Sequence, residues 1–143
     1  MSMEKPDHHD AELVLRVYEL RREPVMRESR LSILRDLWPK TFEDLQAVLK
    51  PEHPLNRAYR QVGSYWEMVY SFARHGIVNH DFWMENNGEG LFVFARVAPF
   101  VEQLRQTAPV AFKNAEWAAK ETVAGRRLFE MFSARVKKAL ESR

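Results

Sequence analysis

The chain has 143 residues, of which 45% are hydrophobic and 29% charged, and its formal net charge at pH 7 is +2. This length suits one domain with a sizeable core, and the absence of cysteine excludes disulfides, thiol catalysis and thiolate metal sites. Charged residues interrupt every apolar stretch before the ~20 residues that a membrane span needs, and the polar start lacks a signal-peptide core, so we expect no membrane association and a cytoplasmic location.

The polar first nine residues are predicted to be disordered. Asp7 or Asp10 is suited to cap a first helix. Pro24 interrupts the helical pattern that follows, and it either kinks one long helix or opens a second helix at its first turn. This second segment is expected to stop near Pro39.

The stretch TFED, residues 41–44, resembles a capping box with Asp in place of the usual Glu, and it predicts a short helix. The strongest signal follows, from about Leu55 to His75. At 100° per residue its apolar and polar side chains fall on opposite faces, which indicates a helix with one side in the core. Gly76 is predicted to end this helix in the left-handed conformation, with Ile77 making the apolar contact that accompanies such an ending. The apolar face consists of Leu55, Ala58, Tyr59, Val62, Tyr65, Trp66, Val69, Phe72 and Ala73.

Asn79 or Asp81 is expected to start a short helix, and NNGEG, residues 86–90, predicts a loop. The next helix, about residues 91–106, is apolar over much of its surface, which indicates a central position. Pro99 is expected to bend it. A last long helical region follows and runs to about Leu140, with Gly125 as a bend or a point of close packing.

Together these elements predict an all-α fold. We expect a single-domain bundle of six or seven helices that spans residues 10–142, after a disordered polar segment at residues 1–9. A central antiparallel helix pair is expected within residues 55–106.

No catalytic residue, metal site or cofactor site emerges from the motifs. His8, His9 and Asp10 are competent metal ligands, but they lie in the flexible start of the chain. There is no Glu-x-x-His pair and no His-Glu-x-x-His motif. Ser64 and Ser71 lie near His75 without the Gly-x-Ser-x-Gly elbow of a nucleophile. We therefore expect no metal and no cofactor.

Four polar residues form the candidate functional cluster, in a structural or a ligand-contacting role: Glu67, Arg74, His75 and Arg105. Glu67 and Arg105 lie near opposite ends of the polar faces of their predicted helices, and an ion pair between the two helices is one hypothesis, which the sequence leaves open. Three aromatic residues are the candidates for lining a pocket, with core packing as the simpler interpretation: Trp66, Trp83 and Phe94.

The middle of the chain, about residues 57–106, resembles a family of small bacterial helical proteins known as domain of unknown function 4760. The resemblance depends on the helix, glycine corner and second helix start YWEMVYSFARHGIVNHDFW, and on the proline-containing helix FARVAPFVEQLRQ. It implies an all-α fold and no known activity. The positions that match the family pattern are Glu67, Gly76, Trp83, Pro99 and Arg105.

These observations support three functional hypotheses. The first is a non-enzymatic, soluble protein that self-associates, as a homodimer, or binds a protein partner, because amphipathic helices and 12% aromatic residues favour interfaces. The second is a small-molecule-binding or enzymatic domain with an aromatic-lined pocket. The third is weak nucleic-acid binding through the basic C-terminal helix. Residues 101–143 carry nine Lys or Arg against five Asp or Glu, but a solvated helix face accounts for this excess equally well.

Overall fold

The computed structural model describes residues 5–143, which contain helices and no strands. The all-α, single-domain prediction is confirmed. In order along the chain, the helices are α1 (His8–Arg22), α2 (Pro24–Asp36), α3 (Phe42–Val48), α4 (Asn56–Arg74), α5 (His80–Asn86), α6 (Glu89–Val97), the 3-10 helix η1 (Ala98–Phe100), α7 (Val101–Leu104), α8 (Lys113–Glu121) and α9 (Val123–Glu141).

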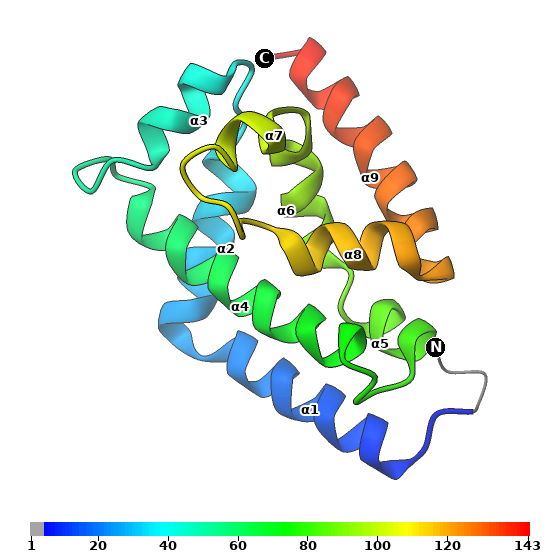
Figure 1. Ribbon diagram of the computed structural model, residues 1–143. Coiled ribbons are helices and arrows are strands. Elements are labelled where there is room, and N and C mark those ends of the chain that lie inside the picture. The colour runs from blue at the N-terminus through cyan, green and yellow to red at the C-terminus, as the bar shows by residue number, and fades with distance from the viewer. Residues whose placement is uncertain (1–4) are drawn as a thin grey trace.

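The helices form one bundle around α4 and α6. Figure 1 shows α1 and α9 on the outside of the bundle, with α4, α6 and α8 between them. Helix α4 packs against α2 and α8, whereas α6 packs against α9 and α8. None of the helices in residues 5–143 is both long and apolar enough to cross a membrane.

Asp7, one of the two predicted caps, begins the first helix. Asp7 accepts hydrogen bonds from the backbone N–H groups of His9 and Asp10, while the Asp10 side chain accepts one from the N–H of Asp7. This reciprocal capping box satisfies N–H groups that the helix itself leaves open. His8 and His9, predicted to be disordered, therefore form the first turn of α1. Residues 1–4, which were also predicted to be disordered, lie outside the described residues.

Pro24 separates two helices and does not kink a single one. Helix α1 ends at Arg22, and Pro24 occupies the first position of α2, where its missing N–H costs nothing. The Glu23 side chain accepts hydrogen bonds from the N–H groups of Val25 and Met26, at 3.2 and 2.9 Å. Glu23 therefore serves as the cap of α2.

Gly76 ends α4 as predicted. Its φ is +72°, in the left-handed region that glycine adopts without a steric penalty. The N–H of Ile77 donates to the carbonyl of Phe72, and that of Gly76 to the carbonyl of Ala73, which is the pattern of a Schellman motif. Ile77, expected to make the apolar contact, is 48% exposed, and Val78 is the buried residue at this corner.

The loop predicted over residues 86–90 is shorter than expected, because α6 begins at Glu89. Gly90 is helical and lies against α4. A Cβ atom at this position would lie 2.5 Å from the hydroxyl of Tyr70 and 2.6 Å from the ring of Trp66. This close approach explains a glycine in the first turn of a buried helix.

Two helical regions that were predicted as continuous are each divided, which raises the number of helices above seven. At Pro99 the chain passes through η1 into the short α7, because proline cannot supply an interior N–H group. At Thr122 the last region divides into α8 and α9. The Thr122 side chain accepts a hydrogen bond from the N–H of Gly125 at 2.9 Å, as an N-cap residue does.

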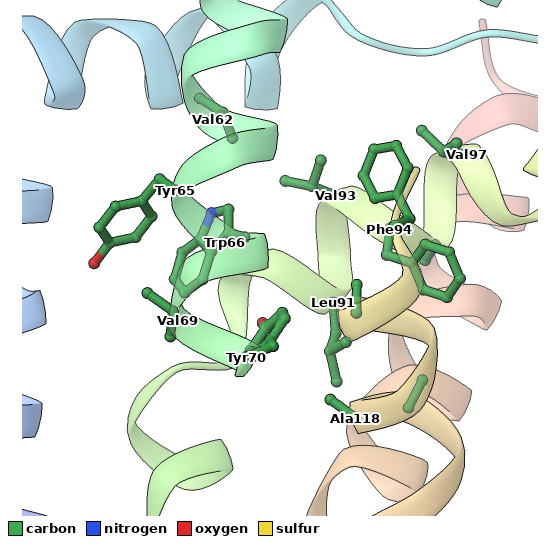
Figure 2. Packing of buried hydrophobic residues seen from close by; sticks show 14 of the residues in the cluster. Val62, Tyr65, Trp66, Val69, Tyr70, Leu91, Val93, Phe94, Val97 and Ala118 are labelled. Carbon is green, nitrogen blue, oxygen red and sulfur yellow. The ribbon is translucent and has the colours of Figure 1, made fainter. Parts of the chain in front are cut away.

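The core lies where α4, α6 and α8 meet. Figure 2 shows Trp66 and Tyr70 on the side of α4 that faces Leu91 and Val93 of α6. Tyr65 points the other way and donates its hydroxyl hydrogen to the carbonyl of Val17 in α1. Both faces of α4 thus contribute to the packing of the bundle.

Candidate functional site

The corner between α7 and α8 has the most unusual backbone among the described residues. Phe112 precedes α8 with φ +57°, and it is the only non-glycine residue in residues 5–143 with positive φ. A bulky residue in this region stores strain, which persists where surrounding contacts enforce it. Phe112 makes no side-chain cap for α8, so the helix needs a cap from elsewhere.

Glu67 of α4 supplies that cap. Its two carboxylate oxygens accept hydrogen bonds from the backbone N–H groups of Asn114 and Ala115, each at 2.9 Å. The side-chain amide of Asn114 in turn donates to the backbone carbonyl of Glu67 at 3.0 Å. A carboxylate at a helix N-terminus satisfies open N–H groups and interacts favourably with the helix dipole. Glu67 therefore fixes the start of α8 against α4.

Arg105 holds the same corner from its other side. Its Nε donates to the carbonyl of Ala111 at 2.9 Å, and its guanidinium pairs with the Glu116 carboxylate at 3.0 Å. The hypothesised pair between Glu67 and Arg105 is not among the ion pairs of residues 5–143. The two residues instead bond to successive parts of one segment, residues 111–116, and both stabilise the α7–α8 corner.

Burial shapes the electrostatics of this corner. It raises the pKa of Glu67, although the two N–H bonds and the positive charge of Arg105 counteract part of that rise. Desolvation also acts on Glu116, but the hydrogen bonds from Arg105 and Lys120 outweigh it and lower the pKa of that carboxyl. The two acids of the corner therefore have pKa values shifted in opposite directions.

Three of the four predicted cluster residues meet at this corner. Arg74 donates to the Asn114 side-chain oxygen at 2.9 Å, and thus joins Glu67 and Arg105 around the start of α8. His75 is exposed at the end of α4, one residue beyond Arg74. The hydroxyls of Ser64 and Ser71 donate to carbonyls of their own helix.

The three predicted aromatic residues do not line a common pocket. Trp83 is fully buried and donates its Nε1–H to the carbonyl of Val69 at 2.8 Å. Trp66 is 3% exposed and stacks on Tyr70 in the core. Phe94 lines a pocket of about 420 Å³ between the α6–α7 segment and helices α8 and α9. All three rings therefore belong to the core, and one of them, Phe94, also borders a cavity.

A second hollow lies on the opposite side of the α7–α8 corner. It is a groove of about 390 Å³ between α4 and residues 110–112, with an almost entirely apolar lining. Phe112 borders this groove and stacks on Phe94 of the first pocket, with ring centroids 5.8 Å apart. Glu67 borders the groove and Glu116 the first pocket. The first pocket therefore has two carboxylates in its lining, Glu102 and Glu116, and the groove has one, Glu67.

Arg96 is a structural residue that the sequence analysis did not single out. It is 2% exposed, and one of its nitrogens donates to the carbonyls of Ile33, Leu34 and Leu37 at the end of α2. The sequence offers one signal for this role. A charged arginine in a helix that is apolar on most sides needs hydrogen-bond acceptors inside the protein.

Two further arginines attach the N-terminal helices to the core. Arg21 is 8% exposed and donates to the side-chain oxygens of Tyr65 and Asn87. Arg30 forms two hydrogen bonds with the Glu89 carboxylate, at 2.7 and 2.8 Å. Neither residue stands out in the sequence, because their partners lie between 44 and 66 positions away.

The outer face of α1 is the second candidate surface. Four exposed residues on it follow one another at intervals of four, three and four positions: Ala11, Leu15, Tyr18 and Arg22. Leu15 is 60% exposed and Tyr18 44% exposed. This interval is that of helix–helix packing seams. We call these four residues the α1 stripe.

We predict that Glu67→Gln lowers the free energy of unfolding by about 1–3 kcal/mol. An amide retains one acceptor oxygen but turns an NH₂ donor toward the second backbone N–H at the start of α8, which leaves a half-buried donor unsatisfied. Urea denaturation of both proteins measures the difference. Glu85→Gln, at an exposed position of α5, is the matched control and is expected to change stability by under ~0.5 kcal/mol. Equal stability of the two variants would contradict the capping role.

Among residues 5–143 no group of three or more His, Asp or Glu side chains is placed to hold a metal ion.

Comparisons with known proteins give no match among curated proteins or solved structures. A family model described as Domain of unknown function (DUF4760) matches residues 6–122. This range contains both helices of the resemblance, the Glu67 cap and the α7–α8 corner. The chain therefore belongs to the family described as Domain of unknown function 4760.

Proposed function

We propose that this protein acts by binding and not by catalysis, as a self-associating interaction protein whose dimer contact is the α1 stripe. The observation that carries this proposal is the exposed row of Leu15 and Tyr18 on a helix whose opposite face already packs in the bundle. Val17 is 2% exposed on that inner face. Apolar side chains on both faces of a helix favour a neighbour on each side.

A second copy of α1 is the occupant that the stripe fits best. In an antiparallel pair related by a two-fold axis, Leu15 of one copy lies against Tyr18 of the other, and Ala11 lies against Arg22. Helix α1 is about 22 Å long, and it has the exposed Glu12 in its first half and the exposed Arg22 in its last turn. An antiparallel arrangement brings the basic end of each copy to the acidic end of the other, which favours this orientation.

The groups at the α7–α8 corner support a binding role over a catalytic one. The Glu67 carboxylate, the Asn114 amide and two of the three guanidinium nitrogens of Arg105 are bonded to the protein itself, and the Nη2 atom of Arg105 has no partner among the described residues. Catalysis needs such groups to converge on a reacting atom. Here their bonds stabilise the fold around them.

Light scattering coupled to size-exclusion chromatography tests the dimer. We expect the wild-type protein to form a dimer, and the double variant Leu15→Glu/Tyr18→Glu to be a folded monomer, because four buried carboxylates would repel one another across the axis. Met131→Glu is the matched control, since Met131 is 46% exposed on α9, on the other side of the bundle (Figure 1). A wild-type monomer at high concentration, or a double variant that dimerises like the wild type, would refute this proposal.

A further inference from the structure

The groove between α4 and residues 110–112 has the size of a small-molecule site. Its volume is about 390 Å³, within the range of ~300–1,000 Å³ that ligand pockets occupy. Tyr59 and Phe112 form its aromatic part, with ring centroids 6.2 Å apart and ring planes at 63°. Val110, which is 77% exposed, forms its outer lip. The groove therefore offers an apolar surface that is open at one side.

Gly63 forms the floor of the groove, and the fold does not require a glycine there. No heavy atom lies within 4 Å of the position that its Cβ would take, and the residue lies inside α4. A glycine inside a helix is less favourable than an alanine. At Gly90 and Gly125 close packing explains the glycine, but at Gly63 its effect is to leave the groove open.

Two polar groups of the groove have bonding capacity to spare. Burial raises the pKa of Tyr59 to about 12, so its phenol remains protonated at neutral pH, and the structure gives it no hydrogen bond among the described residues. Each Glu67 oxygen accepts one backbone N–H, and a carboxylate oxygen has room for a second donor. Arg60 lies at the other end of the groove, where its Nε donates to Asn56.

We propose that this groove binds a small organic amine with an aromatic or branched apolar body. The body lies over Gly63 and against the edge-to-face rings of Tyr59 and Phe112, and the ammonium group donates to the Glu67 carboxylate. Arg60 and Glu67 are seven positions apart in α4, which is about 10 Å along the helix. The positive charge at Arg60 repels an ammonium group and the negative charge at Glu67 attracts it, so the charges orient the ligand in one direction.

The charge of the ligand is tested with three compounds of similar shape. 2-Phenylethylamine, 2-phenylethanol and 3-phenylpropionate are titrated into the wild-type protein, and binding is followed by calorimetry and by NMR shifts of α4 amides. We expect the amine to bind at least about tenfold more tightly than the alcohol, because a hydrogen bond to a charged group is worth about 1.5–3 kcal/mol. The acid is expected to bind most weakly. Equal affinities for the three compounds, or no binding of the amine, would overturn the proposal.

Variants test the place of binding. Gly63→Leu fills the floor of the groove without a clash at Cβ and is expected to abolish amine binding while the protein stays folded. Arg57→Leu places the same side chain at an exposed position of α4 outside the groove and is expected to bind the amine like the wild type. Glu67→Gln is expected to remove the preference for the amine over the alcohol. Unchanged amine binding by Gly63→Leu would overturn the proposal.

The groove and the dimer contact are separable. The variant Leu15→Glu/Tyr18→Glu is expected to bind the amine with wild-type affinity, whether or not the wild-type protein is a dimer. If Gly63→Leu changed the oligomeric state and left amine binding intact, the groove would instead hold a second copy of the chain, and the proposal would be wrong.

Discussion

Replacing Gly125 by alanine is expected to lower the free energy of unfolding by about 3 kcal/mol or more. A Cβ atom on Gly125 would lie 2.0 Å from the carbonyl oxygen of Ala118 and 2.3 Å from the hydroxyl of Thr122. The carbonyl belongs to the last turns of α8, so it cannot turn aside as a flexible side chain does. The same carbonyl accepts a hydrogen bond from Thr122 at 2.8 Å, so any shift that relieves the clash also disturbs the cap of α9.

Thermal unfolding measures this effect, and two other glycines are its controls. A loss of this size lowers the melting temperature by about 10 °C in a chain of this length. Gly63→Ala is expected to raise stability by roughly 0.5–1 kcal/mol, because its site is open and helical. Gly76→Ala is expected to cost about 1–2 kcal/mol, because φ is +72° there. A Gly125→Ala protein as stable as Gly63→Ala would show that α8 and α9 are not packed as described.

The sequence predicted those features whose physical causes lie within a few residues of one another. Thr41 and Asp44 form the reciprocal capping box that TFED indicated, and Gly76 ends α4 in the left-handed conformation. In each case the side chain or the backbone conformation acts on the adjacent turn. Pro24 was ambiguous for the same reason: a proline fits both a kink and a helix start, and its immediate neighbours do not distinguish them.

The divided helices show where local patterns mislead. Thr122 carries a usable N-cap signal, but the apolar stripe of the last region continues across it, so the region was predicted as one helix. Gly90 was assigned to a loop because glycine is frequent in loops. In the structure it is helical, and its small size matters because the rings of Trp66 and Tyr70 lie against it. That contact joins residues about 20 positions apart, which no local pattern reveals.

The candidate polar cluster illustrates the same limit for side chains. A helical projection placed Glu67 on the polar face of α4, and it is the residue that holds the corner. Its bonding partners are backbone N–H groups of Asn114 and Ala115, which carry no signal in the sequence because every residue except proline has an N–H group. The sequence therefore left the partner of Glu67 open, and Arg105 bonds to the same segment without pairing with it.

Replacing Arg96 by alanine is expected to lower the free energy of unfolding by about 3 kcal/mol or more. The substitution removes the side-chain donor from the carbonyls of Ile33, Leu34 and Leu37 at the end of α2, of which the Ile33 carbonyl keeps the N–H of Leu37. It also empties the space between two rings, since the guanidinium lies 3.8 Å from the ring centroid of Trp38 and 4.5 Å from that of Phe92.

Arg96→Met separates the two contributions, because methionine fills much of the space without a donor or a charge. Burial lowers the pKa of Arg96 to about 10, so the guanidinium stays charged at neutral pH, and two of its nitrogens have no hydrogen-bond partner among the described residues. Burying that charge costs free energy, and the methionine variant avoids this cost. We expect Arg96→Met to be less stable than the wild type by about 1–2 kcal/mol, between the wild type and Arg96→Ala. Urea denaturation of the three proteins gives the order. A methionine variant as stable as the wild type would mean that the desolvation of Arg96 cancels its three hydrogen bonds, and that packing alone holds α2 against α6.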